Sequence, residues 1–472
     1  MNLDDRRERP ALSRREALGS LAALLGSGLA LEARADPGDE KARLATFEAD
    51  VTPPLGHACM GGGIAPVKRV DDPLFAKGFV LTGPFRPIVV VVVDWCEIRN
   101  DAHSRWRSAL AEAAGTDPAR VLVASVHQHD APVADLDAER ILHAHKAAGS
   151  VCDLAFHEQT VQRVADALRQ GLRTTKAVSH VGLGQAKVER VASNRRFLTV
   201  DGKVSFSRTS ASHDPRAHEQ PEGTIDPWLK TLSFWDGDRP LLAMSVYATH
   251  PMSYYGQGAV SSDFVGLARQ RRQKEEPDVL QIYASGCSGN VTAGKYNEGT
   301  VEDKSALTDR MHSAMTRAWE ATRRQPIGTV GFRSVSFRLE PRDDPGFTVE
   351  DLTKRLTTDP KPFGQCLAAL GLSWRKRCDA GAKLDLPVLD LGPAQVVLLP
   401  GESYIEYQLL AQRLRPDSFV LTLGYGECAT GYVPTEKAVN ENDTNLHDWC
   451  WVAPGAEQVM TDALTAALKS PA

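Results

Sequence analysis

Four side chains that can bind a metal ion stand where apolar, β-branched runs of this 472-residue chain break into turns containing proline or glycine. They are His127, His250, Glu402 and Tyr432. Such breaks are where a sheet presents side chains to a cleft. Imidazole nitrogens combined with carboxylate or phenolate oxygens form a ligand set typical of zinc. The pattern favours a metal-dependent hydrolase.

A second histidine, His129, lies two residues after His127. On a regular strand, residues two apart share a face, so we expect the two imidazoles side by side. One ring can then bind the metal while the other contacts water or the leaving group as a general acid or base. Zinc lowers the pKa of bound water to about 7, which supplies a nucleophile at neutral pH. The alternative is a histidine pair that only caps a strand end.

Strand-like and helix-like segments alternate along the chain, which predicts an α/β fold with a mixed β-sheet core flanked by helices. The chain is long for one core, so we expect a catalytic region over residues 36–472, with two lobes meeting near residue 330. The expected strands are 44–51, 79–81, 88–93, 121–126, 178–191, 204–207, 241–249, 279–284, 330–339 and 391–399. The expected helices are 104–114, 156–172, 307–322 and 348–357, the first capped by Asn100 or Asp101.

The N-terminus has the features of an export signal. Arg14 and Arg15 directly precede a mildly apolar run over residues 18–31, and small residues at Ala33 and Ala35 suit a signal peptidase. We therefore expect residues 1–35 to be a twin-arginine signal peptide and the protein to be periplasmic or secreted. The alternative is a leader that stays attached. The run is shorter than the roughly 20 apolar residues that cross a bilayer, and we expect no transmembrane segment.

Composition excludes one class of partner and leaves another question open. A net charge of -5 provides no basic surface for nucleic acid. The eight cysteines form no CxxC pair, so a cysteine zinc site is not expected. Two disulfides are compatible with the spacing: one between Cys366 and Cys378, and one between Cys428 and Cys450 on either side of Tyr432.

The residues named so far resemble motifs of the neutral ceramidases and their bacterial ceramidase-like relatives, over roughly residues 47–452. The segment His127-Gln-His129-Asp-Ala-Pro is similar to the family's His-Thr-His-Ser-Gly-Pro, and Asn194-Arg195-Arg196 to an Asn-Arg-Ser segment whose arginine lines the active site. The other matching segments are 47–56, 72–77, His250-Pro-Met-Ser with Ser261-Ser262-Asp263, Pro400-Gly-Glu402, and Gly431-Tyr432-Val433. The resemblance implies that His127, His250, Glu402 and Tyr432 bind one zinc ion.

The side-chain chemistry of two more residues, Arg195 and Asp263, suits a role in the same site. The planar fork of Arg195 suits a carbonyl oxygen or an anionic group, although Arg196 competes and both could form a solvated face. Asp263 fits a residue that orients a ligand imidazole.

The sequence departs from the family at the active-site serine. The best register places Gly286 there, and Ser285 and Ser288 are neighbouring candidates without a clear match. With no serine, the metal-activated water would attack the substrate directly. Asp130 replaces a family serine, and we expect no C-terminal immunoglobulin-like domain, because the chain ends soon after Tyr432. Alternatively, the turn at residues 286–289 only lets backbone approach the site closely.

These observations favour an exported zinc-dependent hydrolase that cleaves an amide bond in a ceramide-like or other N-acyl substrate. A lipid-like substrate would bring the protein into peripheral contact with a membrane. The oligomeric state stays open. The alternatives are an esterase or lactonase on the same scaffold, and a binding protein without catalytic activity. For single residues, Glu402 could instead cap a helix starting near Ser403, and Tyr432 could be an ordinary strand tyrosine.

Overall fold

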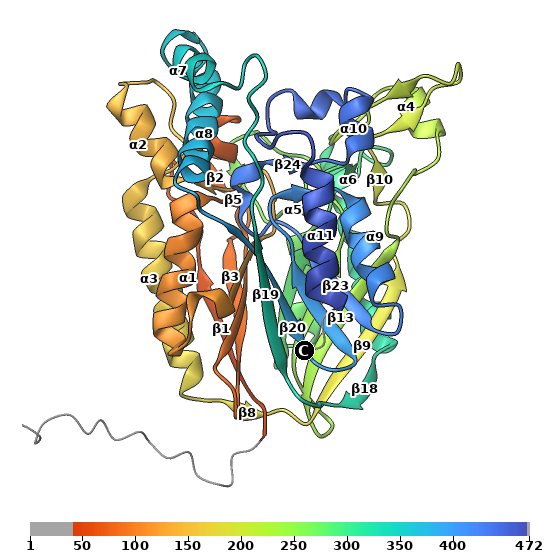
Figure 1. Cartoon of the computed structure of the whole chain (residues 1–472). Coiled ribbons are helices and arrows are strands. Elements are labelled where there is room, and N and C mark those ends of the chain that lie inside the picture. The colour runs from red at the N-terminus through yellow and green to blue at the C-terminus, as the bar shows by residue number, and fades with distance from the viewer. Residues whose placement is uncertain (1–40, 470–472) are drawn as a thin grey trace, which may run out of the picture. The chain divides into compact units, whose positions relative to one another are not determined.

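The main sheets of the protein each contain one pair of neighbouring parallel strands. The computed structural model describes residues 41–469, which belong to one compact unit. Figure 1 shows helices covering several β-sheets, and the strands pair both in parallel and antiparallel fashion. This confirms the predicted α/β fold. The expected signal peptide lies outside the described residues.

The first sheet has the strand order β6-β4-β3-β1-β8. Only β4 and β6 are parallel. Its elements are β1 (Arg43–Asp50), β3 (Phe75–Thr82), β4 (Ile88–Val93), β6 (Val121–Ser125) and β8 (Lys176–Ala177), with helices α1 (Asn100–Ala114), α2 (Leu136–Ala144) and α3 (Leu154–Leu172) on one side. Alternate residues of β4 enter two different core clusters, so this strand is buried on both faces, as its unbroken apolar run predicts.

The other two large sheets follow the same plan. Their orders are β16-β14-β13-β9-β18 and β19-β20-β21-β23, with β14 parallel to β16 and β21 parallel to β23. The strands are β9 (His180–Lys187), β13 (Trp228–Asp236), β14 (Arg239–Tyr247), β16 (Leu280–Ser285), β18 (Arg323–Pro326), β19 (Gly331–Phe337), β20 (Leu384–Asp390), β21 (Ala394–Leu398) and β23 (Phe419–Leu423). The helices that follow or flank them are α5 (Asp263–Glu275), α6 (Val301–Glu320), α7 (Val349–Thr358), α8 (Pro362–Asp379), α9 (Ile405–Leu414) and α11 (Ala456–Lys469).

The carboxyl ends of the three parallel pairs meet at one place. The Ser125 backbone N–H at the end of β6 donates to the carbonyl of Tyr425 beyond β23, at 2.9 Å. The Gly424 N–H donates to the carbonyl of Ser285 at the end of β16, also at 2.9 Å. The Ser285 hydroxyl in turn donates to the Val126 carbonyl at 2.7 Å. These bonds tie the three sheets together where the predicted metal ligands begin, the usual position of a site in α/β proteins.

Several local predictions need correction. Helix α1 begins at Asn100, its cap is Arg99, and neither Asn100 nor Asp101 supplies a capping side chain. The Asn100 N–H instead donates to the carboxylate of Glu427 at 2.7 Å. All eight cysteines are free thiols, so neither of the two possible disulfides is formed. Cys366 and Cys378 lie on the same helix, α8, too far apart along it to join. Among the described residues, no helix combines the length and apolar character needed to cross a bilayer.

Candidate metal centre

Three donor side chains converge just beyond the carboxyl ends of β6, β14 and β21, one strand from each of the three large sheets. One donor atom each of His127, His250 and Glu402 lies within 4.8 Å of the others, and all three residues are buried. One carboxylate oxygen of Glu402, Oε2, lies 3.3 Å from Nε2 of His127 and 2.8 Å from Nε2 of His250. Residues far apart in the sequence thus present two imidazoles and one carboxylate to a single point, a donor set that suits zinc.

The far nitrogens of both rings are bound to main-chain carbonyls. The Nδ1 atom of His127 lies 2.9 Å from the Cys96 carbonyl, and Nδ1 of His250 lies 2.5 Å from that of Ser288. A carbonyl only accepts, so each imidazole carries its proton on Nδ1 and has a free electron pair on Nε2. Histidine ligands of metals are held in this way. The donor set therefore fits a bound divalent cation.

Burial and charge shape the protonation of this cluster. Burial lowers the pKa of His250 to about 4, and the positive charge of Arg195 acts in the same direction. Burial opposes the charge on Glu402, but the neighbouring imidazoles outweigh it and hold the pKa of Glu402 below its ordinary value. Burial lowers the pKa of His127, yet the charge of Glu402 outweighs it and raises that pKa overall. A compact negative oxygen facing two imidazoles favours a cation between them.

The position of Glu402 is set by backbone pairing with the Tyr432 segment. Strands β22 (Glu402–Ser403) and β24 (Tyr432–Val433) are parallel, with Glu402 opposite Tyr432. Helix α9 begins only at Ile405 after its cap Tyr404, so Glu402 does not cap it. This excludes the helix-cap alternative.

Tyr432 and Arg195 form one hydrogen-bonded unit at the edge of the cluster. Arg195 Nη1 donates to the Tyr432 hydroxyl at 2.7 Å, and Nη2 lies 3.4 Å from Nε2 of His250. Both side chains are buried, and Nε of Arg195 has no partner among the described residues. Arg196 instead pairs with Glu441 at the surface, so Arg195 is the arginine of the site.

His129 lies beside the cluster, although neither His127 nor His129 is on a strand. β6 stops at Ser125, and His127 adopts φ = 71°, a left-handed conformation that costs roughly 1 kcal/mol or more for such a residue. The rings of His127 and His129 are nevertheless 5.3 Å apart, at 88°. Burial lowers the pKa of His129 well below its ordinary value, and its Nδ1 has no partner among the described residues. A neutral ring with a free nitrogen can accept a proton.

Asp130 stabilises the loop that covers His129. Its carboxylate accepts the Gly256 N–H at 2.8 Å, and the adjoining Tyr255 packs its ring edge-on against His129, 4.9 Å between centroids. Burial raises the pKa of Asp130 to about 7. Asp263, expected to orient an imidazole, instead accepts hydrogen bonds from Ser253 and Phe264, so it fixes the chain after His250.

The turn at residues 286–289 allows close backbone approach, one of the two interpretations left open. A Cβ atom on Gly286 would lie 2.4 Å from Oε1 of Gln408, and one on Gly289 would lie 2.1 Å from the Glu402 carbonyl. A serine at position 286 would therefore require the buried Gln408 side chain to move. The Ser288 hydroxyl is buried and lies 2.7 Å from that of Tyr425.

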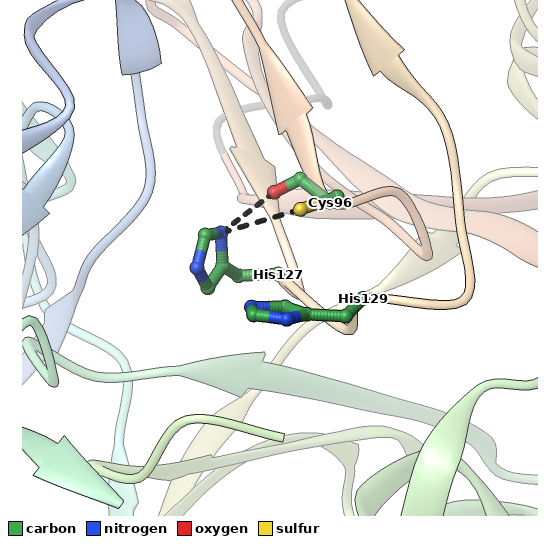
Figure 2. A group of neighbouring side chains, drawn as sticks. All are labelled: Cys96, His127 and His129. Carbon is green, nitrogen blue, oxygen red and sulfur yellow. Dashed lines mark hydrogen bonds between the residues drawn. The ribbon is translucent and has the colours of Figure 1, made fainter. Parts of the chain in front are cut away.

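Tyr425 is a site residue that the sequence analysis missed. Its ring stacks on His127 at 4.2 Å and 16°, and its hydroxyl lies 3.4 Å from Nδ1 of His250. It follows β23 just as His127 follows β6, so the same strand-end signal could have identified it. Cys96 was missed in the same way. It follows β4, and Figure 2 shows Nδ1 of His127 facing both its carbonyl oxygen and its sulfur.

Comparison of whole structures identifies the architecture. A solved structure described as a ceramidase complexed with C2 aligns with 92% of this chain, and the alignment covers 77% of the ceramidase chain. The TM-score is 0.66 and the sequence identity is 17%. A neutral ceramidase from Pseudomonas aeruginosa matches with a TM-score of 0.63 and 17% identity, over 91% of this chain and 74% of its own. This chain has the ceramidase fold. No protein-family model and no curated protein matches the sequence. The similarity to ceramidases was therefore found by comparing structures.

Proposed function

We propose that this protein is an exported, zinc-dependent hydrolase that cleaves an amide bond in a ceramide-like or other N-acyl substrate. The observation that carries the proposal is the meeting of two imidazole nitrogens on one oxygen of Glu402, with both rings anchored through Nδ1. The ceramidase fold supports the choice of an amide bond.

In the proposed arrangement His127, His250, Glu402 and Tyr432 would hold the ion. Bound zinc acidifies water and polarises a carbonyl group. Arg195 holds the hydroxyl of Tyr432 in place and excludes water from that side, because it is buried against Tyr432 and His250. Its buried Nε–H has no partner among residues 41–469, which leaves this arginine one unused hydrogen-bond donor.

His129 is the group proposed to move the proton. Burial lowers the pKa of His129 well below its ordinary value, so the ring is neutral at pH 7, and its Nδ1, which has no partner among the described residues, is the atom proposed to accept the proton released by attacking water. The same ring then returns the proton to the leaving amine. In this proposal neither Gly286 nor Ser288 supplies a nucleophile, because glycine has no side chain and the Ser288 hydroxyl is engaged with Tyr425.

Ester or lactone hydrolysis on the same scaffold is the second candidate. An alkoxide leaves more readily than an amine and needs less help from an acid, and the low pKa of His129 makes it a weak reservoir of protons. Parallel assays of N-acyl and O-acyl substrates with matched acyl chains separate the two candidates.

The test combines metal content with that substrate panel. We expect about one zinc per wild-type chain, and we expect His127→Ala to lose both the zinc and the hydrolytic activity by at least about 100-fold. His143→Ala is the control, because this histidine lies on α2 with a mostly exposed side chain. An active, metal-free His127→Ala protein would overturn the assignment. A zinc-loaded wild type that cleaves nothing would favour a binding protein.

For location, we propose export through the twin-arginine signal at Arg14 and Arg15. Cell fractionation of a chain with both arginines replaced by lysine checks it. The wild type should be found in the periplasm or medium and the variant inside the cell, and equal distribution of both would contradict the proposal.

A further inference from the structure

We propose that His127 is shared between two mutually exclusive cation sites, and that the second one, formed with Cys96 and His129, takes a soft, thiophilic cation. This inference deepens the proposed function, because occupancy of the second site would remove His127 from the hydrolytic one. One donor atom of each of these three residues lies within 4.8 Å of the others, and Figure 2 shows the group.

The geometry suits a cation of this kind. The sulfur of Cys96 lies 3.9 Å from Nδ1 of His127. Tetrahedral coordination, with bonds of about 2.3 Å to sulfur and about 2.0 Å to nitrogen, separates two such donors by roughly 3.5 Å, so this pair needs to close by only a few tenths of an ångström. Nδ1 of His129 is buried and has no hydrogen-bond partner in the described part of the chain. One thiolate and two imidazoles select soft cations over hard ones.

The two sites exclude each other because a neutral imidazole has one free electron pair. With the proton on Nδ1, His127 donates to the Cys96 carbonyl at 2.9 Å and offers Nε2 to the site of His250 and Glu402. With the proton on Nε2, the ring can donate to Glu402 Oε2 at 3.3 Å and offers Nδ1 to Cys96 and His129. Each tautomer therefore has an acceptor in place for its proton.

Binding of the cation at the second site displaces one proton and moves another. The thiol of Cys96 loses its proton to solvent, and the sulfur forms a bond to the cation. The proton of His127 moves from Nδ1 to Nε2, and the freed Nδ1 bonds to the cation. His129 adds a neutral nitrogen and is the most exposed of the three, so the cation enters on its side.

The experiment titrates metal-free full-length protein with Cd²⁺ and follows the ultraviolet thiolate-to-cadmium charge-transfer band. Cd²⁺ held by His127, His250 and Glu402 alone gives no such band, because that site has no sulfur. The wild type should show the band and saturate near one equivalent. Cys96→Ser should lose it, and His129→Gln should weaken Cd²⁺ binding at least about 10-fold. Cys152→Ser is the matched control, since Cys152 is also buried and its thiol donates to the Asp135 carbonyl, outside the group.

A band of wild-type strength in Cys96→Ser, or no band in the wild type, overturns the proposal. Should Cys96→Ser not fold, His129→Gln decides the outcome. Exclusivity is tested on zinc-loaded protein with a zinc indicator: zinc should be released as the cadmium band grows, and both cations bound together would refute sharing of His127. The first titration uses no zinc and no substrate, so its outcome does not depend on the proposed hydrolytic activity.

Discussion

At the scale of single residues, the centre depends on how the ligand imidazoles are oriented. Two rings are fixed by carbonyls at Nδ1, and Tyr425 adds a stacked ring on His127 and a hydroxyl near His250. Its own carbonyl accepts from Ser125, so it connects the chain before His127 with the turn that contains Ser288. In the proposed centre, Tyr425 would position the two histidine ligands without itself binding the ion.

We therefore expect Tyr425→Leu to weaken zinc binding about 10- to 100-fold, the usual effect of removing a residue that orients a ligand. Tyr425→Phe keeps the stacked ring and should lose less. Zinc affinity measured by competition with a chelating dye checks both. Tyr283→Phe serves as the control, because its buried hydroxyl donates to the Tyr247 carbonyl rather than to the site. Unchanged zinc affinity in Tyr425→Leu would mean that the stacking has no positioning role.

The donor residues of the candidate metal centre were predicted from the sequence, but the residues that contact and position them were not. His127, His250 and Glu402 are recognisable because imidazoles and a carboxylate stand at the ends of apolar runs, and the structure brings them together. Tyr425 and Cys96 occupy the same kind of position. They went unrecognised because a tyrosine and a cysteine at a strand end are ordinary core residues unless their neighbours in space are known.

At the scale of elements, the site depends on the close approach of the 286–289 turn to β22. Without a side chain, Gly289 lets its N–H donate to the Ser403 carbonyl at 3.1 Å. A methyl group there would overlap the carbonyl of Glu402 and the ring of Tyr404. Because the clash at Gly289 is with the backbone of β22, the chain has little freedom to relieve it.

Gly289→Ala should therefore displace β22, lower the zinc content and destabilise the fold by about 1 to 3 kcal/mol, the usual range for overpacking. The measurements are metal content and urea denaturation. Gly328→Ala is the matched control, because a Cβ at Gly328 meets nothing within 4 Å and its φ is not positive. A fully zinc-loaded Gly289→Ala protein of normal stability would show that the approach is not required.

Among the elements, the predictable ones were those with a strong local pattern. The unbroken run of β4 and the amphipathic helix α3 were predicted within a few residues of their bounds. Helices α5 and α8 were not predicted. The first is rich in charged residues with buried arginines, and Arg269 pairs with the buried Asp94 directly after β4. Such tertiary pairing is invisible in a local window, and so is the meeting of the three parallel pairs.

At the scale of the whole molecule, burial of neutral histidines makes the fold sensitive to acid. His157 on α3 is buried near Trp95, and burial lowers the pKa of His157 to about 4. The unfolded chain has the ordinary value of 6.5. Between these values the unfolded state binds the extra proton, so the stability contributed at pH 7 is lost as the pH falls from about 6.5 through about 4.

Between pH 7.5 and pH 4.5, the free energy of unfolding should fall by on the order of 2 kcal/mol less in His157→Leu than in the wild type. Urea denaturation at the two pH values measures the change for wild type and variant. His143→Ala, at an exposed position, should leave the pH dependence as in the wild type. An identical acid sensitivity in His157→Leu would contradict the assignment of this group.

X-ray absorption of the zinc-loaded protein tests most directly whether His127, His250 and Glu402 bind the same ion. The arrangement predicts a first shell of nitrogen and oxygen only, at about 2.0 Å, with the multiple scattering of two imidazoles. His250→Ala, like His127→Ala, should fail to hold the zinc and should therefore lose that signal. A sulfur neighbour at about 2.3 Å, or a shell without imidazole, would place zinc elsewhere and contradict the proposed centre.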